Sequence, residues 1–133
     1  MDKAVLSLLG LARRASKAAL GEEQVCDAIR ARTARLVFVA SDCAANASER
    51  LDRFVEDTHI VLLTVPWTKA ELGAAIGWDA CAAAAFTDMG LAASALKKLS
   101  EADPETYGAP YAALDVKAEK MKRRKREKAR RKT

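Results

Sequence analysis

The residues Gly21-Glu22-Glu23-Gln24 combine a flexible turn with the predicted start of a helix, a pattern that suits binding. The first N–H groups of a helix have no partner inside it, so they can donate hydrogen bonds to a ligand. Gly21 allows close approach to the backbone, and the Gln24 amide offers both a donor and an acceptor. The alternative is structural, with Gly21 as a helix cap before acidic residues that the helix dipole favours.

A second candidate site is the loop Gly77-Trp78-Asp79-Ala80, between a predicted helix and an alanine-rich strand. Loops held at the rim of a sheet often carry binding residues. The indole of Trp78 could stack on a nucleic-acid base. Trp78 could equally fold back as a lid over the helix ends.

Basic residues form two further candidates. Arg13, Arg14 and Lys17 could reach phosphates beside the Gly21 turn, or could line a solvated helix face. Residues 117–133 contain 11 Lys or Arg and 2 Glu, a net charge of +9, whereas the rest of the chain has a net charge of −4. Such a tail binds any polyanion with steep salt dependence. Its candidate phosphate contacts are Lys120, Lys122, Arg123, Arg124, Lys125 and Arg126. Nuclear localisation is an alternative on composition, and membrane binding lacks an apolar face.

The sequence offers few candidates for catalytic residues. His59 is the only histidine, and Ser41-Asp42-Cys43 lacks the glycine-rich loop that would accompany a phosphate-handling nucleophile. The three cysteines form no CxxC pair, which favours a reducing cytoplasm over a disulfide framework; they are Cys26, Cys43 and Cys81. The chain shows no signal peptide and no apolar run of membrane-spanning length. We therefore expect a cytoplasmic protein with no enzymatic activity, metal, cofactor, membrane contact or small-molecule substrate.

Apolar spacing predicts the elements that would hold these sites in place. Helices are predicted over 3–15, 22–32, 46–57, 69–76 and 89–99, and strands over 18–20, 36–40, 60–65 and 81–86. Asn46 and Glu49 have the spacing of a capping box. Helices that alternate with strands apolar on both faces predict an α/β fold, specifically a three-layer α/β/α sandwich.

The sequence around the second loop is the most detailed signal. Thr68 and Glu71 form a capping box, and Trp67 and Leu72 are spaced as a hydrophobic staple. Gly77 is placed as a helix C′ glycine. Residues 81–86 are mostly alanine, which predicts a central strand covered closely on both faces.

The composition changes after Leu99. Residues 103–113 include two prolines and a glycine and are predicted to be a linker between a domain at 1–102 and a basic tail at 114–133. The tail has few helix breakers but many like charges. We expect it to be disordered or helical, ordering when it meets a polyanion.

Three segments resemble the ribosomal protein 7Ae/30e superfamily, the kink-turn RNA binders, and in particular its bacterial YlxQ-like branch. They are LLGLARRASKAALGEEQVCDAIR at 8–30, LVFVASDCAANASERL at 36–51 and ELGAAIG at 71–77, within a match of roughly residues 4–99. The resemblance implies a small mixed four-stranded sheet. It also implies that the Gly21–Gln24 turn contacts sheared G·A pairs, with Lys17 as the RNA-binding basic residue just upstream, and that Gly77–Ala80 packs against an extruded nucleotide.

The chain departs from the family at two positions. Glu23 stands where many members have asparagine or lysine, and Asp27 where many have lysine. Negative charge there should weaken binding to a phosphate backbone. Two functions therefore remain open: a ribosome- or RNP-associated protein that recognises kinked or looped RNA, and a protein-interaction module of the same fold whose only RNA contact is the basic tail.

Overall fold

The structure is a computed structural model that describes residues 3–131. Met1 and Asp2 of the predicted domain, and Lys132 and Thr133 of the predicted tail, lie outside the described residues. The elements are α1 (Lys3–Arg14), β1 (Ala18–Leu20), α2 (Glu22–Arg30), β2 (Leu36–Val39), α3 (Ala45–Val55), β3 (Val61–Thr64), α4 (Lys69–Ile76), β4 (Ala83–Phe86), α5 (Met89–Ala102) and α6 (Pro104–Arg131).

The four strands form one mixed sheet in the order β1-β4-β2-β3. Strand β4 pairs antiparallel with both β1 and β2, and β2 pairs parallel with β3. All four residues of β4 are fully buried, which confirms the predicted central alanine strand. Side chains alternate between the two faces of the sheet, as the pleat requires.

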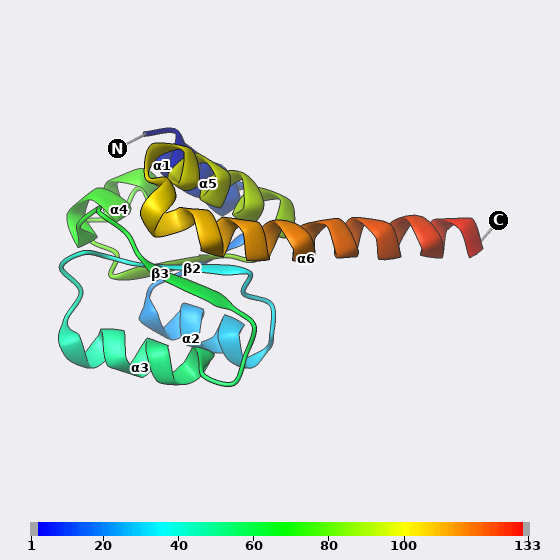
Figure 1. Ribbon diagram of the computed structural model, residues 1–133. Helices are drawn as coiled ribbons and strands as arrows, with labels where there is room; N and C mark the ends of the chain where they lie inside the picture. The colour runs from blue at the N-terminus through cyan, green and yellow to red at the C-terminus, as the bar shows by residue number, and fades with distance from the viewer. Residues whose placement is uncertain (1–2, 132–133) are drawn as a thin grey trace.

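Helices cover both faces of the sheet, so the predicted three-layer sandwich is confirmed (Figure 1). Helices α1, α4, α5 and α6 lie on one side, where Phe38 and Phe86 meet edge to face at 5.5 Å between ring centroids. Helices α2 and α3 lie on the other side, where Val37 and Val39 pack with Leu51. The small alanines of β4 let both layers approach closely.

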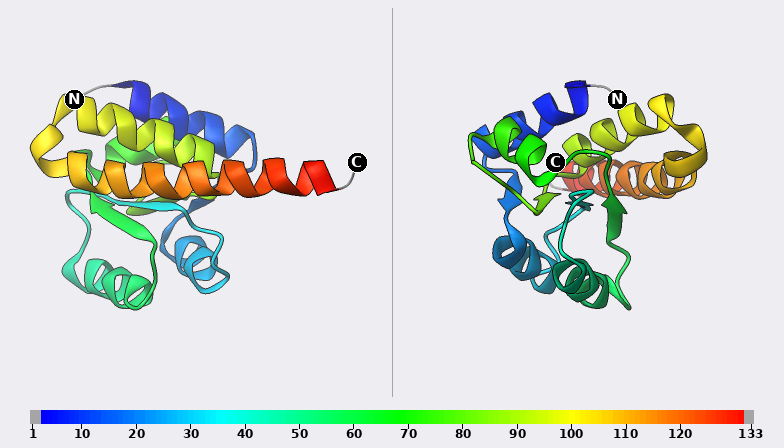
Figure 2. Two further views of the ribbon diagram at one scale, coloured as in Figure 1. Left: turned by 45° about the vertical axis from the view of Figure 1, so that its right-hand side comes forward. Right: turned by 90° about the vertical axis from the view of Figure 1, so that its left-hand side faces the viewer.

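Residues 103–113 do not form the expected linker. They open α6, which runs from Pro104 to Arg131 as one helix alongside α5 (Figure 2). The Asp103 carboxylate accepts from the N–H of Thr106 at 3.3 Å, so Pro104 is the first helical residue, a position that proline favours. Burial of Tyr107 and Leu114 outweighs the cost of Pro110 inside the helix.

Two other expectations also need correction. Helix α3 begins after Ala44 without a side-chain cap, so the Asn46–Glu49 capping box is wrong. Strand β3, predicted to be buried, is an edge strand and is only partly buried, with Thr64 exposed. Apolar composition alone did not distinguish an edge strand from a central one. Within residues 3–131, every helix is too short or too polar to span a bilayer.

Candidate nucleic-acid interface

Gly21 is the N-cap of α2 and has a φ of 86°, in the left-handed region that side chains rarely adopt. Its N–H donates to the carbonyl of Ala83 at 2.9 Å, which joins the turn to the start of β4. No side chain caps α2. The turn therefore needs glycine for its conformation, and the first turn of the helix keeps N–H groups available for a ligand.

Gln24 is oriented by the backbone before it. Its Oε1 accepts a hydrogen bond from the N–H of Leu20 at 3.0 Å. This bond places the amide NH₂ group on the other side, so Gln24 offers mainly donors to a ligand. The sequence had suggested a donor and an acceptor equally.

The Gly77–Ala80 loop is fixed by hydrogen bonds at the end of α4. Gly77 has φ 76° and ψ 24°, and the N–H of Trp78 donates to the carbonyl of Gly73 at 2.8 Å, as in a Schellman motif. The Thr68–Glu71 capping box at the start of α4 is present. The predicted helix and its glycine stop are thus confirmed.

Gly73 is a structural requirement of this loop that the sequence analysis missed. A Cβ on Gly73 would lie 2.8 Å from the backbone of Ala80 and from the carbonyl oxygen of Trp78. Only glycine lets the loop fold back onto α4 at this distance. The signal was a glycine inside a predicted helix, which usually has a packing reason.

The two predicted sites meet at Trp78. A Cβ on Gly21 would lie 3.5 Å from Cζ3 of the indole and 3.8 Å from Cη2. Trp78 is nevertheless 38% exposed, unlike Trp67, which is 5% exposed in the core. Trp78 therefore packs against the Gly21 turn and still offers part of its ring to a ligand. We call Gly21–Gln24 together with Gly77–Ala80 the two-loop surface.

The helix side of this surface carries acidic residues. Glu22 pairs with Arg50 of α3 at 3.3 Å, and Asp27 pairs with Arg30 at 3.9 Å. These side chains, with Glu23 and Cys26, line a hollow between α2 and α3. Burial raises the pKa of the Cys26 thiol. Arg50, which neutralises Glu22, was not predicted from the sequence because it comes from a separate helix.

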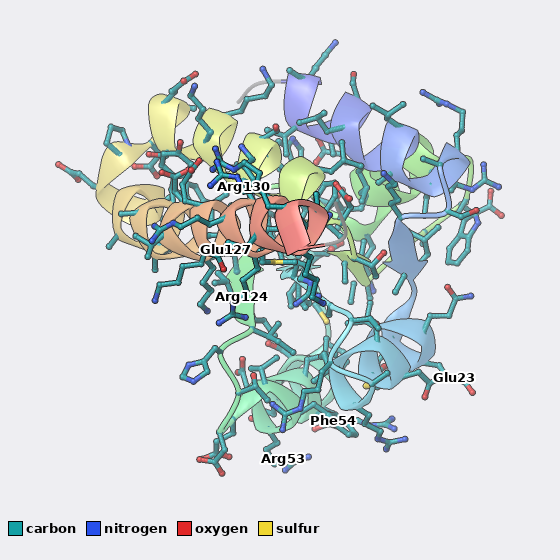
Figure 3. The ribbon with its side chains drawn as sticks, turned by 90° about the vertical axis from the view of Figure 1, so that its right-hand side faces the viewer. Glu23, Arg53, Phe54, Arg124, Glu127 and Arg130 are labelled. Atoms are coloured by element: carbon teal, nitrogen blue, oxygen red, sulfur yellow. The ribbon has the colours of Figure 1, made fainter. Side chains whose placement is uncertain are left out.

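A phenylalanine lies beside this hollow. The guanidinium of Arg30 lies 4.6 Å from the centroid of the Phe54 ring, and that of Arg50 lies 5.7 Å from it. Figure 3 shows Phe54 and Arg53 on the same side of the sheet as Glu23. Cation–π contacts hold the two arginines over the ring.

The structure places Lys17 away from Gly21. Lys17 lies at the opposite end of β1, where its carbonyl accepts from the N–H of Thr87 and its ammonium pairs with Asp88 at 3.5 Å. Arg13 is exposed at the end of α1. The Arg14 side chain folds back toward Gly10 of the same helix. One of its guanidinium nitrogens lies 3.6 Å from the position that a Cβ on Gly10 would occupy. Arg14 therefore approaches α4, whereas Lys17 does not reach the Gly21 turn.

The basic half of α6 extends beyond the body of the protein (Figure 1). The candidate cations Lys120, Lys122, Arg123, Arg124, Lys125 and Arg126 are all exposed. Lys122 pairs with Glu119 at 3.7 Å, and Lys117 donates to the carbonyl oxygen of His59. Seen along α6, Arg124 lies well apart from Glu23 (Figure 3). The basic half of α6 therefore does not cover the two-loop surface.

Cys43 and Cys81 differ in their burial. Cys43 is partly buried and Cys81 is buried, and burial raises the pKa of both thiols. The Cys81 thiol donates to the carbonyl of Ala83 at 3.0 Å. Among residues 3–131, no group of three His, Cys, Asp or Glu side chains could hold a metal ion.

The chain belongs to the ribosomal protein L7Ae/L30e/S12e/Gadd45 family, whose model matches residues 3–96. It is 36% identical over 89 residues to the RNA-binding protein YlxQ of Bacillus subtilis, a match that covers 64% of this chain and 84% of YlxQ. This match confirms the YlxQ-like branch.

Two other proteins are similar over nearly the same extent. The chain is 31% identical over 87 residues to the large ribosomal subunit protein eL30 of Tetrahymena thermophila, which covers 65% of this chain and 84% of that protein. A solved structure of a Bacillus halodurans protein of unknown function aligns with a TM-score of 0.66 and 31% identity. That alignment covers 71% of this chain and 94% of the other.

Proposed function

We propose that this chain is a non-catalytic, cytoplasmic RNA-binding protein associated with the ribosome or another RNP. It recognises kinked or looped RNA through the two-loop surface, and the basic half of α6 adds phosphate contacts. Similarity to the RNA-binding protein YlxQ and to the ribosomal protein eL30 supports RNA as the partner. The observation that carries the proposal is the contact between Trp78 and Gly21, which joins two family-matched loops into one surface.

Each part of this surface has a role in the proposed recognition. The free N–H groups of the first turn of α2 and the NH₂ of Gln24 donate to base edges or phosphates. Trp78 stacks on an unpaired base, a contact worth about 1–3 kcal/mol in single-strand binders. Gly21 lets the RNA backbone approach closely.

One observation favours a second function. The hollow beside the Gly21 turn contains Glu22, Glu23 and Asp27, and only Arg30 and Arg50 balance them. Carboxylates repel a phosphate backbone, so this side of the domain suits a protein partner better than RNA. In that case only α6 would contact RNA.

Charge reversal on α2 distinguishes the two functions. Glu23→Lys with Asp27→Lys in the full chain is compared with Glu101→Lys and Glu105→Lys, which make the same charge change on the opposite face of the sheet. If α2 faces RNA, the first pair tightens kink-turn binding about tenfold more than the second, because two repulsive charges become attractive. Equal tightening by both pairs would favour the protein-interaction module.

A further inference from the structure

A groove between α5 and α6 has a volume of about 530 Å³. Its floor begins at Thr87 and Asp88, at the end of β4 away from the Gly21 turn. The volume falls within the range of about 300–1,000 Å³ typical of ligand pockets. The groove is separate from the two-loop surface, because none of its lining residues belongs to those two loops.

Part of the groove lining is apolar. Its apolar side chains are Met89 and Ala93 of α5 and Tyr111, Ala118 and Met121 of α6. Tyr111 is only partly buried, so part of an aromatic ring remains available to a ligand. Aromatic rings and thioethers are good surfaces for planar, polarisable groups.

The rim of the groove is positively charged. Its cations are Arg35, Lys97, Lys122 and Lys125, against the carboxylates Asp88 and Asp115. Asp88 is already engaged, because it accepts from the N–H of Leu91 at 2.9 Å and pairs with Lys17. Across residues 3–131, Arg35, Lys97 and Lys125 have no carboxylate partner. The groove therefore presents unpaired cations beside apolar lining residues.

Half of this groove lies outside the part of the chain that the family shares. The family match ends at residue 96, so it excludes Lys97 and the whole of α6. The other lining residues are Arg35, Thr87, Asp88 and residues at the start of α5. The groove exists only because α6 folds against α5, which makes it a property of this chain.

We propose that this groove binds unpaired nucleotides of an RNA strand. The bases pack against Tyr111 and the two methionines, and the phosphates lie on Lys97 and Lys125. In a strand with unpaired bases, the bases can pack on the apolar lining of the groove while the phosphates contact its cations. A regular duplex keeps its bases stacked inside and offers phosphates alone. The inference rests on the proposed function for RNA as the ligand, but it uses a different surface.

Two charge-reversal pairs in the full chain test this site. Lys97→Glu with Lys125→Glu alters the groove, and Lys98→Glu with Lys120→Glu is the matched control. Lys98 does not line the groove. Lys120 follows the buried Ala118 by two residues, which places it about 200° around the helix and away from the groove. The probe is a short fluorescein-labelled oligouridylate, with binding followed by fluorescence anisotropy.

We expect the groove pair to weaken binding about tenfold more than the control pair, because both variants change the net charge equally. An oligonucleotide that contains 5-iodouridine should cross-link to Tyr111 under ultraviolet light. Equal weakening by both pairs, or no cross-link at Tyr111, would overturn the proposal. Displacement of the strand by uridine monophosphate at equal nucleotide concentration would also overturn it, since the ligand would then be a free nucleotide.

The same variants separate this proposal from the proposed function. The groove pair should retain the preference for kink-turn RNA over a straight duplex, because it leaves the two-loop surface unchanged. A second result would be a wild-type chain with no such preference and a groove pair that still weakens oligouridylate binding more than the control pair does. That result would contradict the proposed kink-turn recognition and would support the proposed groove site.

Discussion

The indole of Trp78 lies against Gly21, so a side chain at position 21 would meet the ring at 3.5 Å. The two residues are far apart in the sequence: Gly21 connects β1 to α2, and Trp78 lies between α4 and β4. Their contact makes one continuous surface from two loops. It also explains how Trp78 can be both anchored and 38% exposed.

Gly21→Ala tests the conformation of this turn. The positive φ strains any side chain, and the new methyl group would meet the Trp78 ring. We expect the free energy of unfolding to fall by about 1–2 kcal/mol, measured by urea denaturation. Gly108→Ala is the control, since a Cβ there has open space inside α6. That change should be neutral or should stabilise the protein by up to about 1 kcal/mol. Equal effects of the two substitutions would contradict the assigned role of Gly21.

Gly73→Ala tests the support of the second loop. The added Cβ would clash with backbone atoms of Ala80 and Trp78, which cannot move independently of the loop. We expect a loss of about 1–3 kcal/mol in stability and a displaced indole, detectable as a change in Trp78 fluorescence. Gly77→Ala makes the matched comparison, because a Cβ there meets nothing within 4 Å and only the positive φ opposes it. A stable Gly73→Ala protein with unchanged fluorescence would show that the loop does not depend on this glycine.

Much of the fold could be predicted from local signals. Some helices and strands could be predicted because their signals depend only on residues that are neighbours in the sequence. Examples are the capping box at Thr68, the glycine at the end of α4, Gly77, and the apolar runs. The edge position of β3 and the ion pair between Arg50 and Glu22 could not be predicted, because both depend on which elements become neighbours. The same holds for the meeting of Trp78 with Gly21.

The linker prediction failed for a different reason. Pro104, Gly108 and Pro110 were interpreted as breakers, but Asp103 caps a helix in which proline occupies the first position. The i, i+4, i+7 spacing of Tyr107, Tyr111 and Leu114 was the missed signal, because it places one apolar stripe on α6. Tertiary packing of that stripe on α5 outweighs the local preferences.

Leu114→Ala tests whether α6 is part of the core. Leu114 is 1% exposed, so its truncation should lower the free energy of unfolding by about 2–4 kcal/mol. Val116→Ala is the control on the same helix, because Val116 is 55% exposed and should cost within about 0.5 kcal/mol. Both values come from urea denaturation. A Leu114→Ala protein as stable as Val116→Ala would mean that α6 is detached in solution.

The buried thiols should make stability depend on alkaline pH. Burial raises the pKa of Cys26 and Cys81, so the folded state keeps protons that the unfolded state releases. Their contribution is fully present below the unfolded thiol pKa of about 8.5 and declines as pH rises toward the folded values. Urea denaturation from neutral to alkaline pH measures this decline. Cys81→Ala should make it shallower, and an unchanged slope would contradict the contribution of Cys81.

Thiol reactivity gives a companion test of the same burial. Cys43 is partly exposed, whereas Cys26 and Cys81 are 2% exposed. Iodoacetamide at mildly alkaline pH should therefore modify Cys43 first, as followed by peptide mass spectrometry. Faster modification of Cys81 would indicate that the Gly77–Ala80 loop opens readily.

The most direct test of RNA recognition by the two-loop surface is the affinity of the full chain for a kink-turn RNA and for a straight duplex of equal length. Trp78→Ala and Trp78→Phe are measured beside the wild type. We predict that the wild type prefers the kink-turn and that Trp78→Ala weakens this binding about 5- to 150-fold, whereas Trp78→Phe keeps most of it. Duplex binding through α6 should stay unchanged. Equal affinity of the wild type for both RNAs, with no effect of Trp78→Ala, would contradict the proposal.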